Sequence, residues 1–257
     1  MTDAGRMTDA GRMRDFLDLL DPGNEDFLEE LRAKAEAEKV PVIGRGTEAL
    51  LKTLLAAKRP ERVLELGTAV GYSALVMKSV LSELVPGARI TTVENWPSRI
   101  AAAEKNLGLF DPDGVITLVK GDAGVFLEGE AGDTYDLIFM DAAKGQYPVW
   151  LPHLLRCLKE GGVLFADNVL QGGTLLGSRF LLDRRERTIH ARLREFLFEL
   201  THDERLQAAV VPVGDGAAVA VKKPGCGTAG EGKNAGCGTA AEEMPPGGGE
   251  ARAERDE

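Results

Sequence analysis

The feature that most constrains this chain is a regular alternation, from residue 62 to residue 223, between short apolar runs and longer runs with helical spacing. The short runs are rich in Val, Ile and Leu, which is typical of a parallel sheet covered by helices on both faces. We expect an α/β fold with a Rossmann-like, doubly wound sheet that is mostly parallel and ends in an antiparallel hairpin, signalled by Gly214-Asp215-Gly216. The predicted strands are 62–67, 89–94, 116–121, 135–141, 162–167, 207–213 and 216–223, and the predicted helices are 25–38, 45–57, 72–84, 97–107, 147–159 and 183–200.

The two ends of the chain have a different composition from this central part. The first twelve residues repeat the hexapeptide MTDAGR, and the residues after Lys223 are rich in Gly and Pro and internally repetitive. Neither segment carries the apolar periodicity that a packed core needs. We therefore expect a disordered N-terminal repeat over 1–14, one domain over 15–223, and a disordered, acidic, Gly-rich tail over 224–257.

Composition excludes several classes of protein. No run of 18 apolar residues occurs and the N-terminus lacks an apolar segment, so we expect a cytoplasmic protein with no membrane association. The three cysteines form neither a disulfide framework nor a zinc-binding spacing. The net charge of −10 argues against a nucleic-acid partner, because phosphate binding depends on Lys and Arg. The tail holds part of this excess, with three basic and seven acidic residues.

Ligands of open parallel sheets bind beyond the carboxyl ends of the strands, so the residues at these ends are the candidate site. After the first strand, Gly67 and Gly71 allow the backbone to approach a ligand, and Ser73 begins the next helix. Ala69 stands where a dinucleotide-binding GxGxxG motif has its second glycine, which argues against NAD. A glycine turn that serves packing alone explains the same residues.

The next two strand ends suit an adenosyl ligand. Glu94 closes the second strand, where a carboxylate can accept both ribose hydroxyls. Asp122 and Ala123 follow the third strand and would lie beside the adenine. An ordinary solvated turn explains Asp122 equally well.

The last two parallel strands end in oxygen-bearing side chains. Asp141 follows one strand, and Asp167 and Asn168 follow the other. Such hard ligands suit Mg²⁺, Mn²⁺ or Ca²⁺ rather than zinc. The alternative is structural, with Asp167 and Asn168 in an Asx turn and Asp141 capping the next helix. Lys144, one turn after Asp141, is either a base, a partner for an anionic substrate oxygen, or a plain surface lysine.

Taken in order, ELGTAVGYS, the Glu94 strand end, GDA, DAAKGQY and DNVL resemble the cation-dependent O-methyltransferases of the catechol and caffeoyl-coenzyme A type, from about Val40 to Lys223. The resemblance implies a class I methyltransferase that uses S-adenosylmethionine. It implies metal ligands at Asp141, Asp167 and Asn168, and a catalytic role for Asp141 and Lys144. The residues that it places around the methyl donor are Ile43, Gly67, Ser73, Glu94, Asp122, Ala123 and Asp141.

Within this group, VPVIGRGTEALL and VPVGDG are most similar to bacterial enzymes that methylate 5-hydroxyuridine at the wobble position of tRNA. The main expectation is therefore a tRNA substrate, bound by the arginines of 179–196, with Tyr147 and Trp150 as stacking surfaces. A solvated helix and buried aromatics are the structural alternatives. The functional alternatives are methylation of a small catechol-like phenol and a non-catalytic adenosyl- or RNA-binding module. A homodimer is also expected.

Overall fold

The computed structural model describes residues 16–17, 19–178 and 182–225. The predicted N-terminal repeat over 1–14 and all but the first two residues of the predicted tail lie outside this part of the chain. The predicted limits of the central domain, 15–223, remain a prediction.

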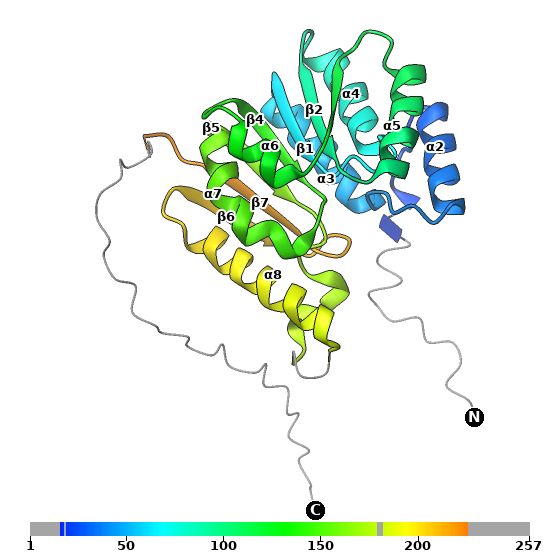
Figure 1. Ribbon diagram of the computed structural model, residues 1–257. Helices are drawn as coiled ribbons and strands as arrows, with labels where there is room; N and C mark the ends of the chain where they lie inside the picture. Colours follow the sequence, from blue (N-terminus) through cyan, green and yellow to red (C-terminus); the bar gives the residue numbers. More distant parts are fainter. Residues whose placement is uncertain (1–15, 18, 179–181, 226–257) are drawn as a thin grey trace, which may run out of the picture. The chain divides into compact units, whose positions relative to one another are not determined.

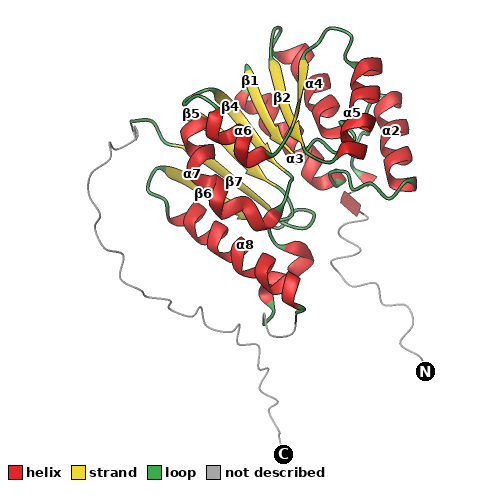
Figure 2. Cartoon of the chain, viewed as in Figure 1, coloured by secondary structure: helices red, strands yellow, loops and turns green. Residues whose placement is uncertain are grey.

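A seven-stranded sheet forms the centre of the fold, in the order β3-β2-β1-β4-β5-β7-β6 (Figures 1 and 2). The first five strands are parallel, whereas β7 pairs antiparallel with both β5 and β6. This confirms the predicted doubly wound α/β sheet with its C-terminal hairpin. The strands are β1 (Arg62–Leu66), β2 (Arg89–Glu94), β3 (Ile116–Lys120), β4 (Tyr135–Met140), β5 (Leu158–Ala166), β6 (Leu206–Val211) and β7 (Ala217–Lys222).

Helices cover both faces of the sheet because the side chains of a strand alternate between its faces. Val63 packs in one buried cluster with α2, α3, α4 and α5, while Leu64 and Leu66 pack in a second cluster with α6, α7 and α8. Leu137 and Ile138 of β4 divide in the same way. The helices are α2 (Asp26–Ala37), α3 (Arg45–Lys58), α4 (Tyr72–Leu84), α5 (Pro97–Phe110), α6 (Ala123–Gly129), α7 (Tyr147–Cys157) and α8 (Arg184–His202).

The structure departs from the predicted elements near the carboxyl end of α7. The helix ends at Cys157 and β5 begins at Leu158, four residues before the predicted start of that strand. Gly161 has a φ of +68°, and the register of β5 against β4 shifts over this stretch. The additional residues therefore form an irregular extension of β5, which a pattern of alternating apolar residues does not reveal.

Several short helical elements of the described residues were not predicted from the sequence. They include α6, the 3₁₀ helix η1 (Lys144–Gln146) and the 3₁₀ helix η2 (Gln171–Leu176). With three to seven residues, each is too short for helical periodicity to be recognised. Over the described residues, no helix is both long and apolar enough to cross a membrane.

Candidate functional site

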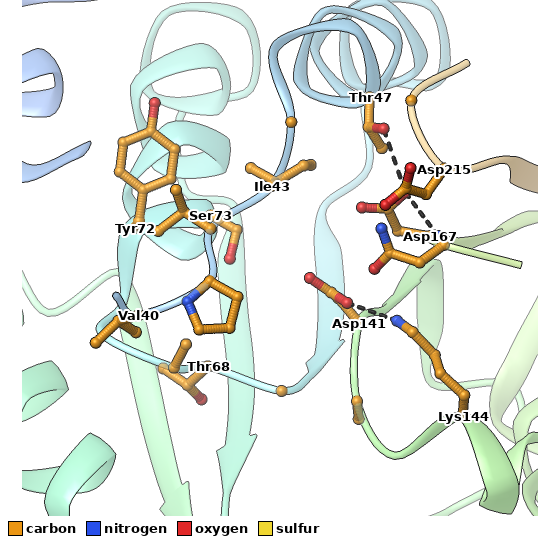
Figure 3. A pocket seen from close by; sticks show the side chains of 18 of the residues that line it. Val40, Ile43, Thr47, Thr68, Tyr72, Ser73, Asp141, Lys144, Asp167 and Asp215 are labelled. Atoms are coloured by element: carbon orange, nitrogen blue, oxygen red, sulfur yellow. Dashed lines mark hydrogen bonds and ion pairs between the residues drawn. The ribbon is translucent and has the colours of Figure 1, made fainter. Parts of the chain in front are cut away.

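A cavity of about 1550 Å³ opens beyond the carboxyl ends of the parallel strands. Its walls come mainly from seven places: the segment 40–47, the turns after β1, β2 and β3, the loops after β4 and β5, and the loop of the β6–β7 hairpin (Figure 3). Of the predicted site residues, all but Asp122 line it: Ile43, Gly67, Ser73, Glu94, Ala123, Asp141, Lys144, Asp167 and Asn168. The topology therefore brings together residues that are more than 120 positions apart in the sequence.

Gly67 lies against the backbone of the β4 strand end. Its φ is +99°, and a Cβ atom built on it would lie 2.2 Å from the carbonyl oxygen of Asp141. The amide of Asp141 donates to the carbonyl of Leu66 at 2.9 Å. Only glycine fits this close approach, so the position is fixed by packing as well as by access to the cavity.

Glu94 is buried and held rigidly at the end of β2. Its Oε2 accepts the amide of Ala69 at 2.9 Å, and its Oε1 accepts the amides of Asn95 and Trp96 at 3.0 and 2.9 Å. These three backbone donors fix the orientation of the carboxylate at the cavity wall. The contact of this carboxylate with a ribose remains a prediction.

Asp122 differs from the prediction. Its side chain is exposed and caps α6, with Oδ1 accepting the amides of Gly124 and Val125 at 2.8 and 3.2 Å. Its neighbours Gly121 and Ala123 line the cavity, but Asp122 itself does not. The side chain therefore has the structural role that was the alternative to ligand binding. A carboxylate that precedes a helix accepts hydrogen bonds from the free amides of the first turn.

Asp141 and Lys144 form an ion pair at the next strand end, drawn in Figure 3. The Lys144 Nζ lies 2.7 Å from Asp141 Oδ1 and 3.2 Å from the Tyr147 hydroxyl. Burial by itself lowers the pKa of Lys144, but its interactions with Tyr147 and Asp141 are stronger and raise this pKa above its ordinary value. These interactions favour the positively charged form of the lysine.

Asp167 is 1% exposed at the end of β5. Its Oδ1 accepts the hydroxyl of Thr47 at 3.2 Å and the amide of Asn168 at 2.8 Å. Burial, and then the negative charge of Asp141, raises the pKa of Asp167 to about 6. The carboxylate lies in a negative environment that a bound cation would relieve.

The predicted metal site consists of two carboxylates and one amide. Within the part of the chain that the structure describes, no group of three His, Cys, Asp or Glu side chains could hold a metal ion. The ligand set therefore depends on Asn168, whose backbone has a φ of +54°. The alternative role of Asp141 as a helix cap is not found, because the residue that precedes η1 is Ala143 and no side chain caps this helix.

Sequence reasoning missed two side chains at this end of the cavity. Thr47, on the first turn of α3, bonds to Asp167, which is 120 residues away. Asp215, in the β6–β7 loop, lines the cavity beside Thr47 and Asp167 in Figure 3. Local patterns offer no signal for Thr47. Asp215 was predicted only as part of a turn. Because the turn lies at the edge of the sheet where ligands bind, a polar residue there could also have been expected to line the cavity.

The expected RNA-binding features lie elsewhere. Tyr147 and Trp150 are 0% and 5% exposed and belong to the core, so the prediction that they form stacking surfaces is wrong. Arg179 lies outside the described residues. Of the other arginines in 179–196 with described side chains, none lines the cavity; Arg192 pairs with Glu195, and Arg194 donates to the carbonyl of Leu175.

The sheet order and the cavity at the strand ends define a class I methyltransferase fold. The chain belongs to the O-methyltransferase family, whose model matches residues 21–223. This family membership supports the part of the predicted resemblance that concerns catechol and caffeoyl-CoA type enzymes. The comparisons give no support for tRNA 5-hydroxyuridine methyltransferases in particular.

Curated relatives are about 30% identical to this chain over the aligned residues. O-methyltransferase ankF from Aspergillus thermomutatus is 31% identical over 155 residues, which cover 60% of this chain and 62% of that protein. Catechol O-methyltransferase from Mycobacterium tuberculosis is 30% identical over 163 residues, which cover 63% and 73%.

Solved structures of similar shape match nearly their whole length. A candidate caffeoyl-CoA O-methyltransferase from Staphylococcus aureus has a TM-score of 0.74 at 28% identity, covering 82% of this chain and 99% of that chain. The SAH-bound methyltransferase PaMTH1 from Podospora anserina has a TM-score of 0.74 at 24% identity, covering 87% and 100%. The fold is shared with both.

Proposed function

We propose that the protein is an S-adenosylmethionine- and divalent-cation-dependent O-methyltransferase that acts on a small catechol-like phenol. The observation that carries this proposal is one cavity in which Glu94 and Ser73 meet Asp141, Lys144, Asp167 and Asn168. Its volume of about 1550 Å³ exceeds the roughly 300–1,000 Å³ of a site for one small ligand. There is room for a methyl donor and an acceptor side by side.

The donor would bind along the turns that follow β1, β2 and β3. In this proposal the Glu94 carboxylate accepts the ribose hydroxyls, and Ala123 packs against the adenine. Ile43, Gly67, Ser73 and Asp141 surround the methionine part. The capping role of Asp122 supports an indirect contribution, in which it orients the first turn of α6 beside the adenine.

Asp141, Asp167 and Asn168 would hold the cation, and the residues fit it. They offer oxygen ligands from adjacent strand ends. Burial, and then the charge of Asp141, raises the pKa of Asp167, and a bound cation would favour its ionised form. A divalent cation held there would lower the pKa of a phenolic hydroxyl and fix the orientation of its oxygen. Thr47 and the amide of Asn168 keep the Asp167 carboxylate in place.

Lys144 would act through its charge. Its ammonium lies beside Asp141, where it would attract the phenolate oxygen and hold it in line with the methyl group. Bringing the two reactants into this orientation lowers the barrier of a displacement without a covalent intermediate on the protein. The proton of the phenol leaves to solvent before the displacement.

The character of the acceptor follows from charge. Asp141, Asp167 and Asp215 line the acceptor end of the cavity, and Lys144 lies among them. Three carboxylates and one ammonium leave no surplus of positive charge to hold a phosphate-rich substrate, even with a divalent cation bound. The catechol O-methyltransferase of M. tuberculosis is a relative of this chain, which also supports a small phenol over tRNA.

The test is transfer of labelled methyl from S-adenosylmethionine to catechol, to phenol and to tRNA that carries 5-hydroxyuridine, each with Mg²⁺ and with EDTA. We expect label in catechol that disappears with EDTA and returns with added Mg²⁺. Asp141→Ala should abolish this transfer. The matched control is Asp136→Ala, which removes a carboxylate from the opposite end of the same strand, where it pairs with Lys159. Label in tRNA alone would refute the proposed acceptor, and EDTA-resistant transfer would refute the proposed cation.

A further inference from the structure

A buried ionic network forms part of the cavity wall, which its members Arg32 and Tyr72 line, and none of the proposed chemistry uses it. Its centre is Arg32 of α2, which is 5% exposed. The guanidinium donates to the Tyr72 hydroxyl at 3.1 Å, to the Ile43 carbonyl at 2.9 Å and to the Glu48 carboxylate. One side chain thus joins α2, the segment before α3, α3 itself and the start of α4.

Glu48 completes the network and is 1% exposed. It accepts the Tyr72 hydroxyl at 2.8 Å, an Asn24 amide hydrogen at 2.8 Å and the Lys52 ammonium at 2.9 Å. Burial by itself raises the pKa of Glu48, but these partners and the charge of Arg32 outweigh it, so the pKa lies below its ordinary value. Glu48 is therefore ionised and fully paired.

Buried charges of this kind are weak devices for stability, because desolvation offsets much of their attraction. Their directional hydrogen bonds instead fix the relative positions of the segments that they join. The segment whose position they fix is 43–47. It forms one wall of the cavity, with Ile43 on the donor side and Thr47 on the acceptor side, as Figure 3 shows. The first turn of α3 has no side-chain cap at Gly44. The Arg32 bond to the Ile43 carbonyl fixes the chain at this entry, together with the ion pair of Arg45 with Glu29.

The other side of the same segment packs on the β6–β7 loop. A Cβ atom on Gly46 would lie 2.9 Å from the Val213 side chain, and one on Gly214 would lie 2.8 Å from the Thr47 hydroxyl oxygen. The segment is therefore held between the ionic network and the hairpin. A shift at Ile43 would be transmitted through one helical turn to Thr47 and so to Asp167.

We propose that Arg32, acting through Tyr72 and Glu48, is a positioning residue that holds segment 43–47 in the form that binds the methyl donor. The proposal rests on the proposed function, since it assigns Ile43 to the donor half of the cavity. Arg32 contributes here by orienting the Ile43 carbonyl and the Tyr72 ring, and it takes no part in the methyl transfer.

The experiment compares two tyrosine variants. Tyr72→Phe removes the hydroxyl that bonds to both Arg32 and Glu48. Tyr135 is also 2% exposed but does not line the cavity, and Tyr135→Phe removes a hydroxyl that donates to Glu130 at 2.9 Å. Both variants lose the bond that the hydroxyl donates to a carboxylate, but Tyr72→Phe also loses the bonds that its hydroxyl accepts from Arg32 and Asn24. It should therefore lose more thermal stability than Tyr135→Phe, and donor affinity is compared at a temperature where both variants are folded. We expect Tyr72→Phe to raise the Kd for S-adenosylmethionine about tenfold, equivalent to about 1.4 kcal/mol, and Tyr135→Phe to leave it unchanged.

Arg32→Lys is the second variant. It keeps the positive charge but cannot bond three partners in the fixed directions of a guanidinium. It should therefore weaken donor binding like Tyr72→Phe, with a larger effect on the KM for the donor than on the KM for the acceptor. If Tyr72→Phe does not fold, Arg32→Lys still tests the positioning role of Arg32.

Two kinds of failure are distinguishable. Equal donor affinity in wild type, Tyr72→Phe and Arg32→Lys would overturn the positioning role while leaving the proposed function intact. Absence of S-adenosylmethionine binding by the wild type would instead overturn the proposed function. Affinity is measured by isothermal titration calorimetry with the full-length chain, and stability by thermal unfolding under the same conditions.

Discussion

Gly67→Ala tests the close approach of β1 to β4 that underlies the site. The new Cβ would lie 2.2 Å from the Asp141 carbonyl oxygen and 2.8 Å from its carbon, whereas ordinary contacts begin near 3.4 Å. The strand end that carries Asp141 would have to move by about 1 Å. Displacements of that size in a catalytic group can lower a rate by about 100-fold.

Gly67→Ala should lower stability through both backbone strain and overpacking, and a control variant separates the two effects. A φ of +99° strains any side chain by about 2 kcal/mol, and overpacking adds about 2 kcal/mol more. Gly87 has a φ of +93°, and a Cβ atom added there would meet no other atom within 4 Å, so Gly87→Ala retains the strain without the clash. At about 3 °C per kcal/mol, we expect the Tm to fall by about 12 °C for Gly67→Ala and about 6 °C for Gly87→Ala.

The assay is thermal unfolding of both variants, followed by methyl transfer at a temperature where each is folded. Gly87→Ala should keep the wild-type kcat, and Gly67→Ala should lose about 100-fold. Equal Tm losses, or full activity in a folded Gly67→Ala protein, would refute the argument that the glycine sets the position of Asp141.

Two further predictions concern stability. Lys222→Met removes a buried ammonium that donates to the carbonyls of Leu155 and Leu158 at 3.0 and 2.6 Å. It should lower the free energy of unfolding in urea by roughly 1–3 kcal/mol without changing the KM for the donor, and an unchanged urea midpoint would contradict this. Hydrogen bonding to Arg45 lowers the pKa of Glu29 to about 2 despite partial burial. A carboxyl group whose pKa is lowered by folding stabilises the fold at pH values above its unfolded pKa of 4.5. The stability difference between wild type and Glu29→Gln should therefore be complete at pH 6 and shrink as the pH falls from 4.5 towards 2. A difference that does not depend on pH would refute this prediction.

Much of the fold was predictable from local pattern. The strands 89–94 and 62–67 and the helix 72–84 were placed correctly or within one residue, because buried parallel strands are continuous apolar runs and amphipathic helices repeat every 3.6 residues. Elements shorter than two turns, such as α6, were not found. The irregular start of β5 was also missed, because its glycines follow neither period.

The sequence by itself determined the class of the fold and the family of the chain, because motif residues at the strand ends keep their order and spacing whatever the packing around them. It also identified the carboxylates Asp141 and Asp167, since parallel strands must place their carboxyl ends at one edge of the sheet. Only the tertiary structure decided what those groups touch. The contact of Thr47 with Asp167, the network of Arg32 with Glu48 and Tyr72, and the burial of Tyr147 each join residues or faces whose proximity depends on how helices pack on the sheet, and this packing leaves no periodic signal in the sequence.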